Sequence, residues 1–451
     1  MKINGKLFLC NYLKINILCY LSFIIYHSSL LMHRLNNLSL QGIHPIDLCQ
    51  KYETPLYVYD TQIIENQYRL LKSTSKEGLS EGAFSDVKNF RINFAMKALS
   101  NINILKFMRS LGSCVDTVSI QEVKLCLHVG FEPSQIGYTP SGVAWDEIEE
   151  AVRLKVKIHL DSIPLLKQFG EKYGSTYPVG IRLNPHVMAG GNLKISTAHE
   201  RSKFGISILQ VEDIHQVRRE TGLVIDGLHQ HTGSEIKEAE TFLEVAEIMF
   251  NTAKTFPDLQ YLDFGGGFKV PYKPHDKGTD MMKVGKLISD RFKEFCKEYG
   301  RDLTLVFEPG KYLVAECGYF FAKVNVVKHN PSVSFAAVDS GLNHLIRPMM
   351  YDAYHEIVNV SNPLKDKKLY NVVGYICETD NFAEDRLLPE ITEGDILCFM
   401  NAGAYGFTMA SNYNSRFRPA EVMIYNGKDY LIRERETMED ILKNQVEVSF
   451  N

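Results

Sequence analysis

The sequence predicts an α/β plus β fold, a TIM-like (β/α)8 barrel with a discontinuous C-terminal β domain. The first observation is a regular alternation, from Tyr57 onward, of short β-rich runs with longer segments whose apolar residues have helical spacing. The second is a change in the order of predicted elements after Gly310, where strand-like runs are joined by loops instead of helices. The third is size, because 451 residues with 45% hydrophobic and 23% charged side chains suffice for two or three globular domains.

Eight β-rich runs separated by helices, over about 250 residues, are typical of a (β/α)8 barrel. The alternation implies parallel strands joined by right-handed crossovers. The expected strands are Ile92–Ala95, Cys114–Val118, Ile136–Thr139, Lys157–Leu160, Val179–Leu183, Gly227–His231, Tyr261–Phe264 and Thr304–Phe307. Helical segments between them include Ile120–Val129, Trp145–Leu154, Ile163–Tyr173 and Ala239–Thr255.

The C-terminal part reads as a β domain whose strands are joined by loops. Its expected strands are Tyr319–Val327, Ser334–Val338, Tyr370–Ile376, Asp395–Met400, Glu421–Tyr425 and Asp429–Arg433. A further run, Leu56–Tyr59, precedes the barrel and is placed to pair with this domain, which would make it discontinuous in sequence. We therefore expect residues 41–60 and 311–451 to form the β domain, and residues 61–310 to form the barrel.

We expect residues 1–40 to form an extension that belongs to neither domain. Lys2 and Lys6 precede an apolar stretch, but its cleanest part, Ile17–Tyr26, is short for a membrane span of about 20 residues. No small-residue cleavage site follows Tyr26, and Met32 opens a more ordinary start. We expect an untranslated stretch before the true start or a targeting segment, and regard a membrane anchor as the least favoured reading.

The composition argues against several classes of protein. A formal net charge of -4, with acidic and basic residues interleaved, lacks the clustered basic face of a nucleic-acid-binding protein. The nine cysteines are scattered and form no CxxC pair, which is typical of reduced thiols in a cytosol-like compartment. We therefore expect a cytoplasmic protein with no nucleic-acid partner.

Residues with chemical potential follow four of the expected strands. Lys97 comes after the first run, His231 ends the sixth, Gly265, Gly266 and Gly267 follow the seventh, and Glu308 follows the eighth. In a barrel of this kind, the carboxyl ends of all strands meet on one face. Together these residues supply an amine, a ring to stack, a phosphate cradle and a carboxylate for a pyridine nitrogen, which are the parts that hold pyridoxal phosphate.

Each of these residues also has a simpler interpretation. A lysine after a strand is usually solvated, although the preceding Asn93–Met96 run favours a partly desolvated amine with a lowered pKa. Glycine runs are common in turns, and Glu308 could be a surface carboxylate. His229 and His231 lie on one face of a strand and could bind a metal ion, with core packing as the other role for His229. No further His/Asp cluster stands at other strand ends, so we expect no metal.

With these motifs in place, the chain resembles the fold-type III, alanine racemase-like decarboxylases that use pyridoxal phosphate, and within them most closely the diaminopimelate decarboxylases. The resemblance runs from about Ile46 to Glu436 and includes the opening Thr54–Asp60. It implies that Lys97 holds the cofactor covalently and that His231 stacks on its ring. It also implies that Ser234, Gly265, Gly266, Gly267 and Gly310 hold the phosphate, and that Glu308 contacts the ring nitrogen.

The resemblance extends to the substrate side of the site. It implies that Lys311, Arg347, Tyr351, Glu378 and Tyr405 bind the substrate, with Tyr405 also touching the cofactor. Cys377 looks like the family's proton donor, so that Lys97 and Cys377 would be the catalytic pair. Because Cys377 and Glu378 reach the partner's site in that family, a homodimer with shared active sites is implied.

The implied activity is decarboxylation of meso-2,6-diaminopimelate to L-lysine and CO2, the last step of lysine biosynthesis. Arg347 and Glu378 match the two opposite charges on the unreacting end of this substrate, which must be paired if they are buried. The alternatives are a decarboxylase for carboxynorspermidine or another basic amino acid, and a non-catalytic binding protein with the same fold. One departure concerns Lys311, where the family usually has an arginine, because lysine lacks the two-pronged geometry for a carboxylate.

Overall fold

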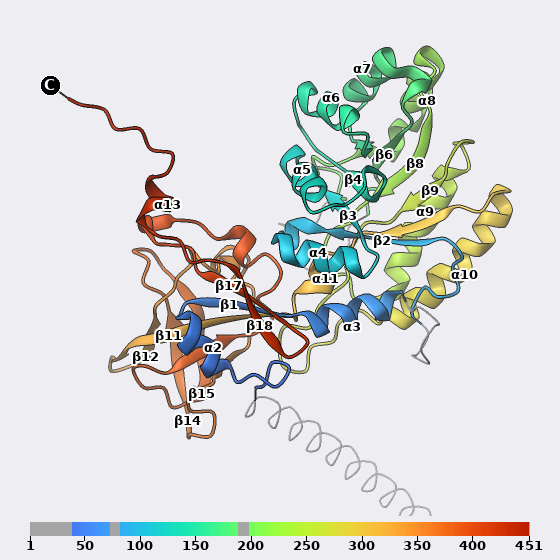
Figure 1. The fold of residues 1–451 in the computed structure, drawn as a ribbon. Helices are drawn as coiled ribbons and strands as arrows, with labels where there is room; N and C mark the ends of the chain where they lie inside the picture. Colours follow the sequence, from blue (N-terminus) through green and yellow to red (C-terminus); the bar gives the residue numbers. More distant parts are fainter. Residues whose placement is uncertain (1–37, 73–81, 188–197, 451) are drawn as a thin grey trace, which may run out of the picture.

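The computed structural model describes residues 38–72, 82–187 and 198–450, and most of the N-terminal extension therefore lies outside the described residues. Figure 1 shows two bodies, a barrel wrapped in helices and a smaller domain made mostly of strands. The blue strand near the start of the chain lies among the orange and red strands near its end. From residue 38 onward, the chain therefore runs from the strand-rich domain through the barrel and back to the strand-rich domain.

The barrel is closed by eight parallel strands, with a ninth short strand paired to one of them. The order around it is β5-β4-β3-β2-β10-β9-β8-β6, and pairing of β5 with β6 closes the ring. These strands are β2 Phe90–Ala95, β3 Cys114–Thr117, β4 Ile136–Tyr138, β5 Lys157–Leu160, β6 Val179–Asn184, β8 Ile225–Gln230, β9 Tyr261–Asp263 and β10 Thr304–Phe307. The ninth is β7 Ile206–Ser207. The predicted (β/α)8 barrel is confirmed.

Helices surround this barrel (Figure 1). They are α3 Thr61–Leu71, α4 Ile102–Ser110, α5 Ile120–His128, α6 Trp145–Arg153, α7 Ile163–Tyr173, α8 Val211–Thr221, α9 Ala239–Ala253 and α10 Met281–Tyr299. Several begin at side chains that accept a hydrogen bond from a free N–H group of the first turn, as Asn101 does for α4 and Asp280 for α10. These capping side chains fix the residue at which each of these helices begins.

The second domain is a nine-stranded sheet. Its strands are β1 Leu56–Asp60, β11 Gly318–His329, β12 Ser334–Val338, β13 Ile357–Asn359, β14 Lys367–Val373, β15 Asn381–Pro389, β16 Ile396–Phe399, β17 Ala420–Tyr425 and β18 Lys428–Arg433. Strand β1 lies between β11, to which it is antiparallel, and β17, to which it is parallel. The predicted discontinuity of this domain follows from that pairing, whereas the boundaries at residues 60 and 310 stay a prediction.

The expected strand Tyr370–Ile376 begins three residues earlier in the structure and ends at Val373. Strands β13 and β15 were not expected. Short helices complete the chain: α2 Pro45–Tyr52, α11 Lys311–Val314, α12 Arg347–Tyr351 and α13 Met438–Leu442. Three-residue 3-10 turns include Met96–Ala98, Phe407–Met409 and Tyr413–Ser415.

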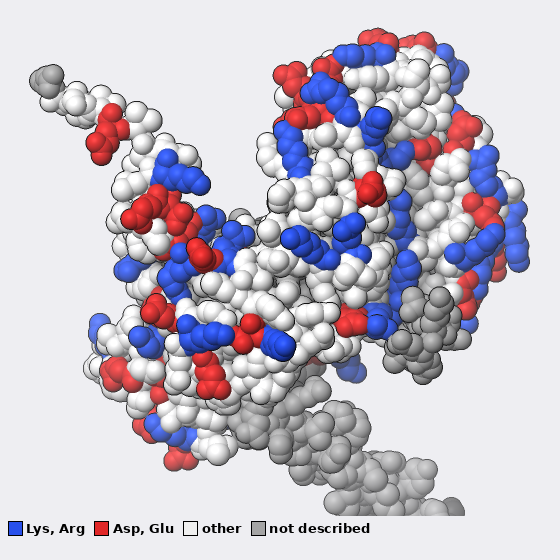
Figure 2. All heavy atoms as spheres, in the orientation of Figure 1, with Lys and Arg blue, Asp and Glu red and all other residues white. Residues whose placement is uncertain are grey.

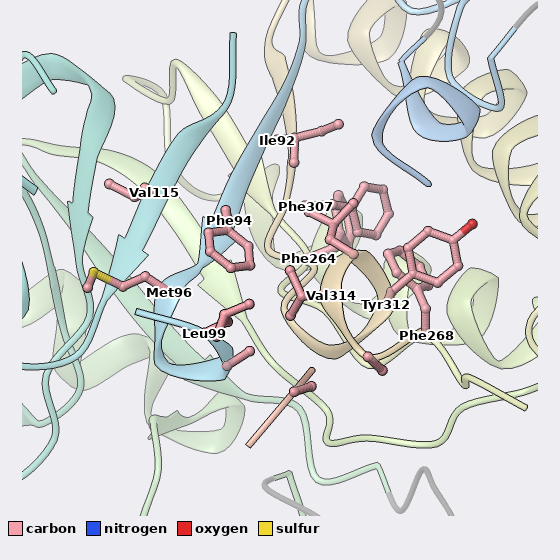
Figure 3. Packing of buried hydrophobic residues seen from close by; sticks show 14 of the residues in the cluster. Ile92, Phe94, Met96, Leu99, Val115, Phe264, Phe268, Phe307, Tyr312 and Val314 are labelled. Carbon is pink, nitrogen blue, oxygen red and sulfur yellow. The ribbon is translucent and has the colours of Figure 1, made fainter. Parts of the chain in front are cut away.

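An aromatic cluster fixes the carboxyl end of β10, where Glu308 follows. Phe307 packs against Phe264 and Phe268 with ring centroids 5.8 and 5.4 Å apart, and Phe268 in turn packs against Tyr312. Figure 3 shows this cluster beside Phe94 and Leu99, which flank Lys97 in sequence. The side chains that precede the chemical groups are therefore buried together, so the groups themselves are held at the barrel mouth.

The two domains are joined by hydrogen bonds near that mouth. The backbone N–H of Tyr405 donates to the carbonyl of Ala98 at 2.9 Å. Asn101, at the start of α4, donates to Glu421 of β17 at 2.9 Å. The β domain is thus docked beside the residues that follow β2.

On the face of the molecule in Figure 2, Lys and Arg side chains lie next to Asp and Glu side chains, in line with a net charge of -4. Among the residues that the structure describes, no helix has both the length and the apolar character required to span a membrane.

Candidate active site

A pocket opens at the carboxyl ends of the barrel strands. It combines residues at or just after the ends of β2, β3, β4, β8, β9 and β10 with Arg182 of β6 and Tyr405 of the β domain. Its polar lining comprises Lys97, Asp116, Thr139, Arg182, His229, His231, Ser234, Glu308, Lys311, Tyr312 and Tyr405, with Gly233, Gly267 and Gly310 exposing backbone. The structure thus brings together Lys97, His231, Ser234, Gly267, Glu308, Gly310, Lys311 and Tyr405 of the predicted site.

Lys97 lies in the 3-10 turn that directly follows β2. Its Nζ atom is 2.8 Å from Oδ2 of Asp116, at the end of the neighbouring β3. Burial alone would lower the pKa of this amine, but the carboxylate of Asp116, with Glu308 behind it, outweighs burial and raises the pKa. The expectation of a lowered pKa is therefore wrong, because it considered the apolar run before Lys97 and not the carboxylate on the adjacent strand.

Asp116 is a site residue that the sequence analysis missed. It is 1% exposed, and burial raises its pKa, with Glu308 adding to the effect and Lys97 opposing it. The sequence offered one signal for Asp116, which is a carboxylate inside the apolar strand β3. This strand pairs with β2, after which Lys97 follows.

The two histidines of β8 and its end have different contacts. His229 points into the barrel, where its Nε2 atom is 2.9 Å from Oε2 of Glu308 and its ring stacks on His159 at 5.0 Å. His231 follows the strand, and its Nδ1 atom accepts the backbone N–H of Gly266 at 3.1 Å. Burial, followed by Arg182, lowers the pKa of both rings well below the usual value, so both are neutral. Core packing of His229 was expected, whereas its bond to Glu308 was not.

The glycine turn after β9 brings backbone close to the pocket. Gly265 and Gly267 have positive φ angles of 65° and 105°, which favour glycine. A Cβ atom at Gly266 would lie 2.6 Å from the carbonyl oxygen of Glu308. The glycine run is predicted to form a phosphate cradle, but two of its N–H groups already have partners, because Gly265 donates to Asp263 and Gly266 to His231. Gly267, Gly233, Ser234 and Gly310 remain as pocket lining on this side.

Glu308 carries a buried oxygen, Oε1, to which the described residues offer no hydrogen-bond donor. Burial raises the pKa of its carboxyl group, against the influence of the Lys97 and Arg182 cations. An amine, a neutral imidazole, a close-approach glycine turn and an unpartnered carboxylate oxygen in one pocket fit the aldehyde, ring, phosphate and ring nitrogen of pyridoxal phosphate. The described residues therefore fit this cofactor.

Two further residues near Glu308 were missed by the sequence analysis. Arg182 of β6 lines the pocket, is 8% exposed and holds its guanidinium 4.7 Å from the centre of the Phe204 ring. Asp263 ends β9, and one oxygen of it lies within 4.8 Å of ligand atoms of both His229 and Glu308. We expected no further His/Asp cluster at the other strand ends, whereas the fold places Asp263 and Glu308 beside His229. A charged residue inside a predicted barrel strand was the signal in both cases.

On the substrate side, Lys311 is 8% exposed and forms an ion pair with Glu235, which follows β8. Burial lowers the pKa of Lys311, while Glu235 opposes the change. Arg347 opens α12 outside the pocket lining, with its guanidinium 5.4 Å from the Tyr272 ring centre and no partner for its Nε atom. Tyr351, at the end of the same helix, is half-buried and also lies outside that lining.

The structure does not bring Cys377 and Glu378 to the pocket of their own chain. Both are exposed, on the loop between β14 and β15. Asn414 donates to the Cys377 sulfur at 3.2 Å, and the Tyr413 hydroxyl donates to Glu378. No cysteine is among the described residues that line the pocket.

Comparison with known proteins agrees with this geometry. Residues 80–315 match the family described as pyridoxal-dependent decarboxylase, pyridoxal binding domain. The chain is 37% identical to the diaminopimelate decarboxylase of Methanothermobacter thermautotrophicus, over 91% of this chain and 95% of the relative. It is 32% identical to that of Aquifex aeolicus, over 93% and 98% of the two chains.

Solved structures give the same result. A crystal structure of a diaminopimelate decarboxylase matches with a TM-score of 0.81 at 31% identity, covering 91% of this chain and 98% of the other. The Helicobacter pylori diaminopimelate decarboxylase complexed with L-lysine matches with a TM-score of 0.78 at 30% identity, over 88% and 98%. A pocket that fits pyridoxal phosphate, on a chain similar to these proteins over nearly its whole length, shows that the protein belongs to the diaminopimelate decarboxylase family of pyridoxal-dependent carboxy-lyases.

Proposed function

We propose that the chain decarboxylates meso-2,6-diaminopimelate to L-lysine and CO2, the last step of lysine biosynthesis. The observation that carries the proposal is the pocket in which Lys97 and the unpartnered oxygen of Glu308 occur together, in a member of this family. A carboxylate of this kind holds a proton on a pyridine nitrogen, and an amine of this kind binds a carbonyl.

The cofactor-binding residues are assigned on the same grounds. Lys97 would hold pyridoxal phosphate covalently, His231 would lie against its ring, and Glu308 would contact its ring nitrogen. Ser234, Gly267 and Gly310 would form the phosphate side, Gly265 and Gly266 would shape the turn that presents them, and Tyr405 would lie at the edge. When bound, the cofactor withdraws electrons from the α-carbon as the carboxylate leaves. Asp116 would hold the Lys97 amine in place through their 2.8 Å contact.

The unreacting end of the substrate carries an ammonium and a carboxylate, and it needs a partner for each. Arg347 is buried and its Nε atom lacks a partner, which supports a carboxylate ligand there. Lys311 already has an anionic partner in Glu235, so its contribution to the carboxylate is weaker than that of an arginine. Tyr351, Glu378 and Tyr405 complete the proposed substrate side.

The proton donor is proposed to come from a second copy of the chain. Cys377 and Glu378 are exposed and absent from the pocket lining, and a cysteine can protonate the α-carbon only at contact distance. A homodimer with shared active sites would bring both residues to the partner's Lys97. We also propose a cytoplasmic location, on the basis of the free, scattered cysteines of the described chain.

The first experiment is to purify the chain, record the absorbance of bound cofactor, and measure lysine and CO2 release from meso-diaminopimelate. A yellow protein that makes lysine supports the proposal. A yellow protein that makes none keeps the cofactor but points to carboxynorspermidine or a basic amino acid. A colourless, inactive protein points instead to a non-catalytic binding protein.

The shared site is tested by mixing two inactive variants, Lys97→Ala and Cys377→Ala, under conditions that exchange subunits. If each site combines Lys97 of one chain with Cys377 of the other, hybrids contain one intact site and about a quarter of the activity returns at equal mixing. The matched control mixes Lys97→Ala with Glu308→Gln. Both residues lie in the same pocket, so no activity should return. A Lys97→Ala and Cys377→Ala mixture that stays inactive would contradict the shared site.

A further inference from the structure

Asp263 is a buried carboxyl group that the proposed function does not use. It ends β9 and has no solvent exposure. Its Oδ1 atom accepts the backbone N–H of Gly265 at 2.9 Å. Its Oδ2 atom is also buried, and no donor among the described residues reaches it. An unpartnered oxygen at this depth indicates that the group is protonated or that it binds something.

Its nearest acidic neighbour is Glu308. Oxygens of the two carboxyl groups and a ring nitrogen of His229 lie within 4.8 Å of one another, and the two carboxyl groups are within hydrogen-bonding reach. Oε1 of Glu308 likewise has no donor among the described residues. Two buried carboxylates this close cannot both be ionised, so a proton or a cation must lie with them.

The charges around the pair decide where a shared proton resides. Glu308 lies near two cations, Lys97 and Arg182, which stabilise its ionised form. Asp263 has two acidic neighbours, Glu308 and Asp116, which destabilise its ionised form. Burial is the larger cause, and together with these charges it raises the pKa of Asp263 well above its usual range. His229 is neutral and contributes one hydrogen bond to Glu308.

We propose that Asp263 is a positioning residue that holds a proton and donates it in a hydrogen bond to Glu308. The negative charge then stays on Glu308, where the ring nitrogen of the cofactor would need it. Because the other oxygen of Asp263 binds the Gly265 N–H group, one side chain ties the glycine turn to the carboxylate. This inference rests on the proposed contact between Glu308 and the ring nitrogen.

The test compares Asp263→Asn with Asp263→Ala in the enzyme loaded with pyridoxal phosphate labelled with 15N in the ring. The 15N chemical shift reports whether the ring nitrogen is protonated, independently of turnover. Asparagine matches a protonated aspartate, since it can accept from Gly265 and donate to Glu308. Asp263→Asn should therefore keep the wild-type 15N shift, and its kcat should stay within about threefold of wild type. This expectation follows because a substitution that retains both hydrogen bonds loses little.

Asp263→Ala removes the donor, so Glu308 takes up a proton itself and can no longer stabilise a protonated ring nitrogen. The 15N signal should move towards the unprotonated value, and kcat should fall roughly 10- to 100-fold, the range for a lost hydrogen bond to a charged group. If Asp263→Ala keeps the wild-type signal, or if Asp263→Asn loses it, the proposal is overturned. An Asp263→Asn chain that fails to fold also overturns it, because the amide should be accepted at a protonated site.

Glu308→Gln separates this inference from the proposed function. If Glu308→Gln leaves the 15N signal unchanged, the proposed role of Glu308 itself fails. If Glu308→Gln moves the signal and Asp263→Ala does not, the inference about Asp263 alone fails. Elemental analysis decides between a proton and a cation, since one tightly bound metal ion per chain, lost in Asp263→Asn, would overturn the proposal.

Discussion

Gly227, in the middle of β8, is a position where a single added methyl group should strongly destabilise the barrel. It pairs directly with Tyr261 on β9. A Cβ atom there would lie 1.9 Å from Cζ of the tyrosine ring and 2.3 Å from its hydroxyl oxygen. Tyr261 is 5% exposed, and its hydroxyl lies 2.8 Å from Nε2 of His159. Gly227→Ala therefore requires a buried ring to leave its place.

The free-energy cost has two parts. Overpacking a well-packed core costs about 1–3 kcal/mol. Moving the tyrosine away from His159 leaves a buried nitrogen without a partner, at a further cost of about 1–3 kcal/mol. We expect Gly227→Ala to lower the free energy of unfolding by about 4 kcal/mol. With a urea dependence of roughly 1–3 kcal/mol per molar, the midpoint of the barrel transition should fall by about 1 M or more.

The matched control is Gly137→Ala on β4, another interior strand of the barrel. Its Cβ atom would meet nothing closer than a backbone oxygen at 3.6 Å, which is ordinary contact. We expect the free energy of unfolding of Gly137→Ala to stay within about 0.5 kcal/mol of wild type. Alanine fits this site without a clash, and it reduces the entropy of the unfolded chain, which offsets any small cost of packing. In a Tyr261→Ala protein the clashing ring is absent, so adding Gly227→Ala should lower the free energy of unfolding only slightly further. A Gly227→Ala protein as stable as Gly137→Ala would refute this account of the barrel interior.

Three further predictions concern single side chains. Lys97→Ala should give a colourless protein with unchanged circular dichroism and no lysine production, and retained turnover would contradict its proposed bond to the cofactor. Glu235→Gln leaves the buried Lys311 amine without its anion and should lower the free energy of unfolding by about 1–2 kcal/mol. The loss is kept this small because Glu235 is partly exposed and solvent screens the pair. An unchanged urea midpoint would argue against that pairing. Burial lowers the pKa of His344 to about 4 from its usual 6.5, so between these pH values the unfolded chain binds a proton that the folded chain does not. Stability should therefore fall as the pH falls, and urea unfolding of His344→Gln at several pH values should show a slope smaller by up to about 1.4 kcal/mol per pH unit.

The barrel was predictable because each of its strands is a short apolar run between helical segments. The apolar spacing of a helix and that of a strand can both be recognised along the chain without knowing which strands are neighbours. Strand β15 was not predicted, because its sequence lacks such a regular apolar pattern. Its outward side chains include Glu384, Asp385 and Leu387, so apolar and polar residues do not alternate along it. It is a strand because β14 pairs with it, which is a tertiary contact and not a local propensity.

The candidate site divides in the same way. Lys97, His231, the glycine turn and Glu308 could be found because each follows a predicted strand and all carboxyl ends meet on one face. Asp116 and Asp263 also lie at strand ends, and a carboxylate inside an apolar strand was a local signal for both, but it does not say which group each one contacts. Their roles depend on which amine or carboxylate stands on the next strand, which only closure of the barrel determines.

The sequence by itself determined the fold class, the cofactor type and the candidate residues for the main chemistry, because these depend on the spacing of apolar residues and on the order of motifs along the chain. Tertiary structure alone decided the protonation states. The pKa of Lys97 is raised and not lowered, since Asp116 on a neighbouring strand outweighs the apolar run beside it. Electrostatic energy depends on distances between charges in space, and the barrel brings together residues as far apart in sequence as Asp116 and Glu308.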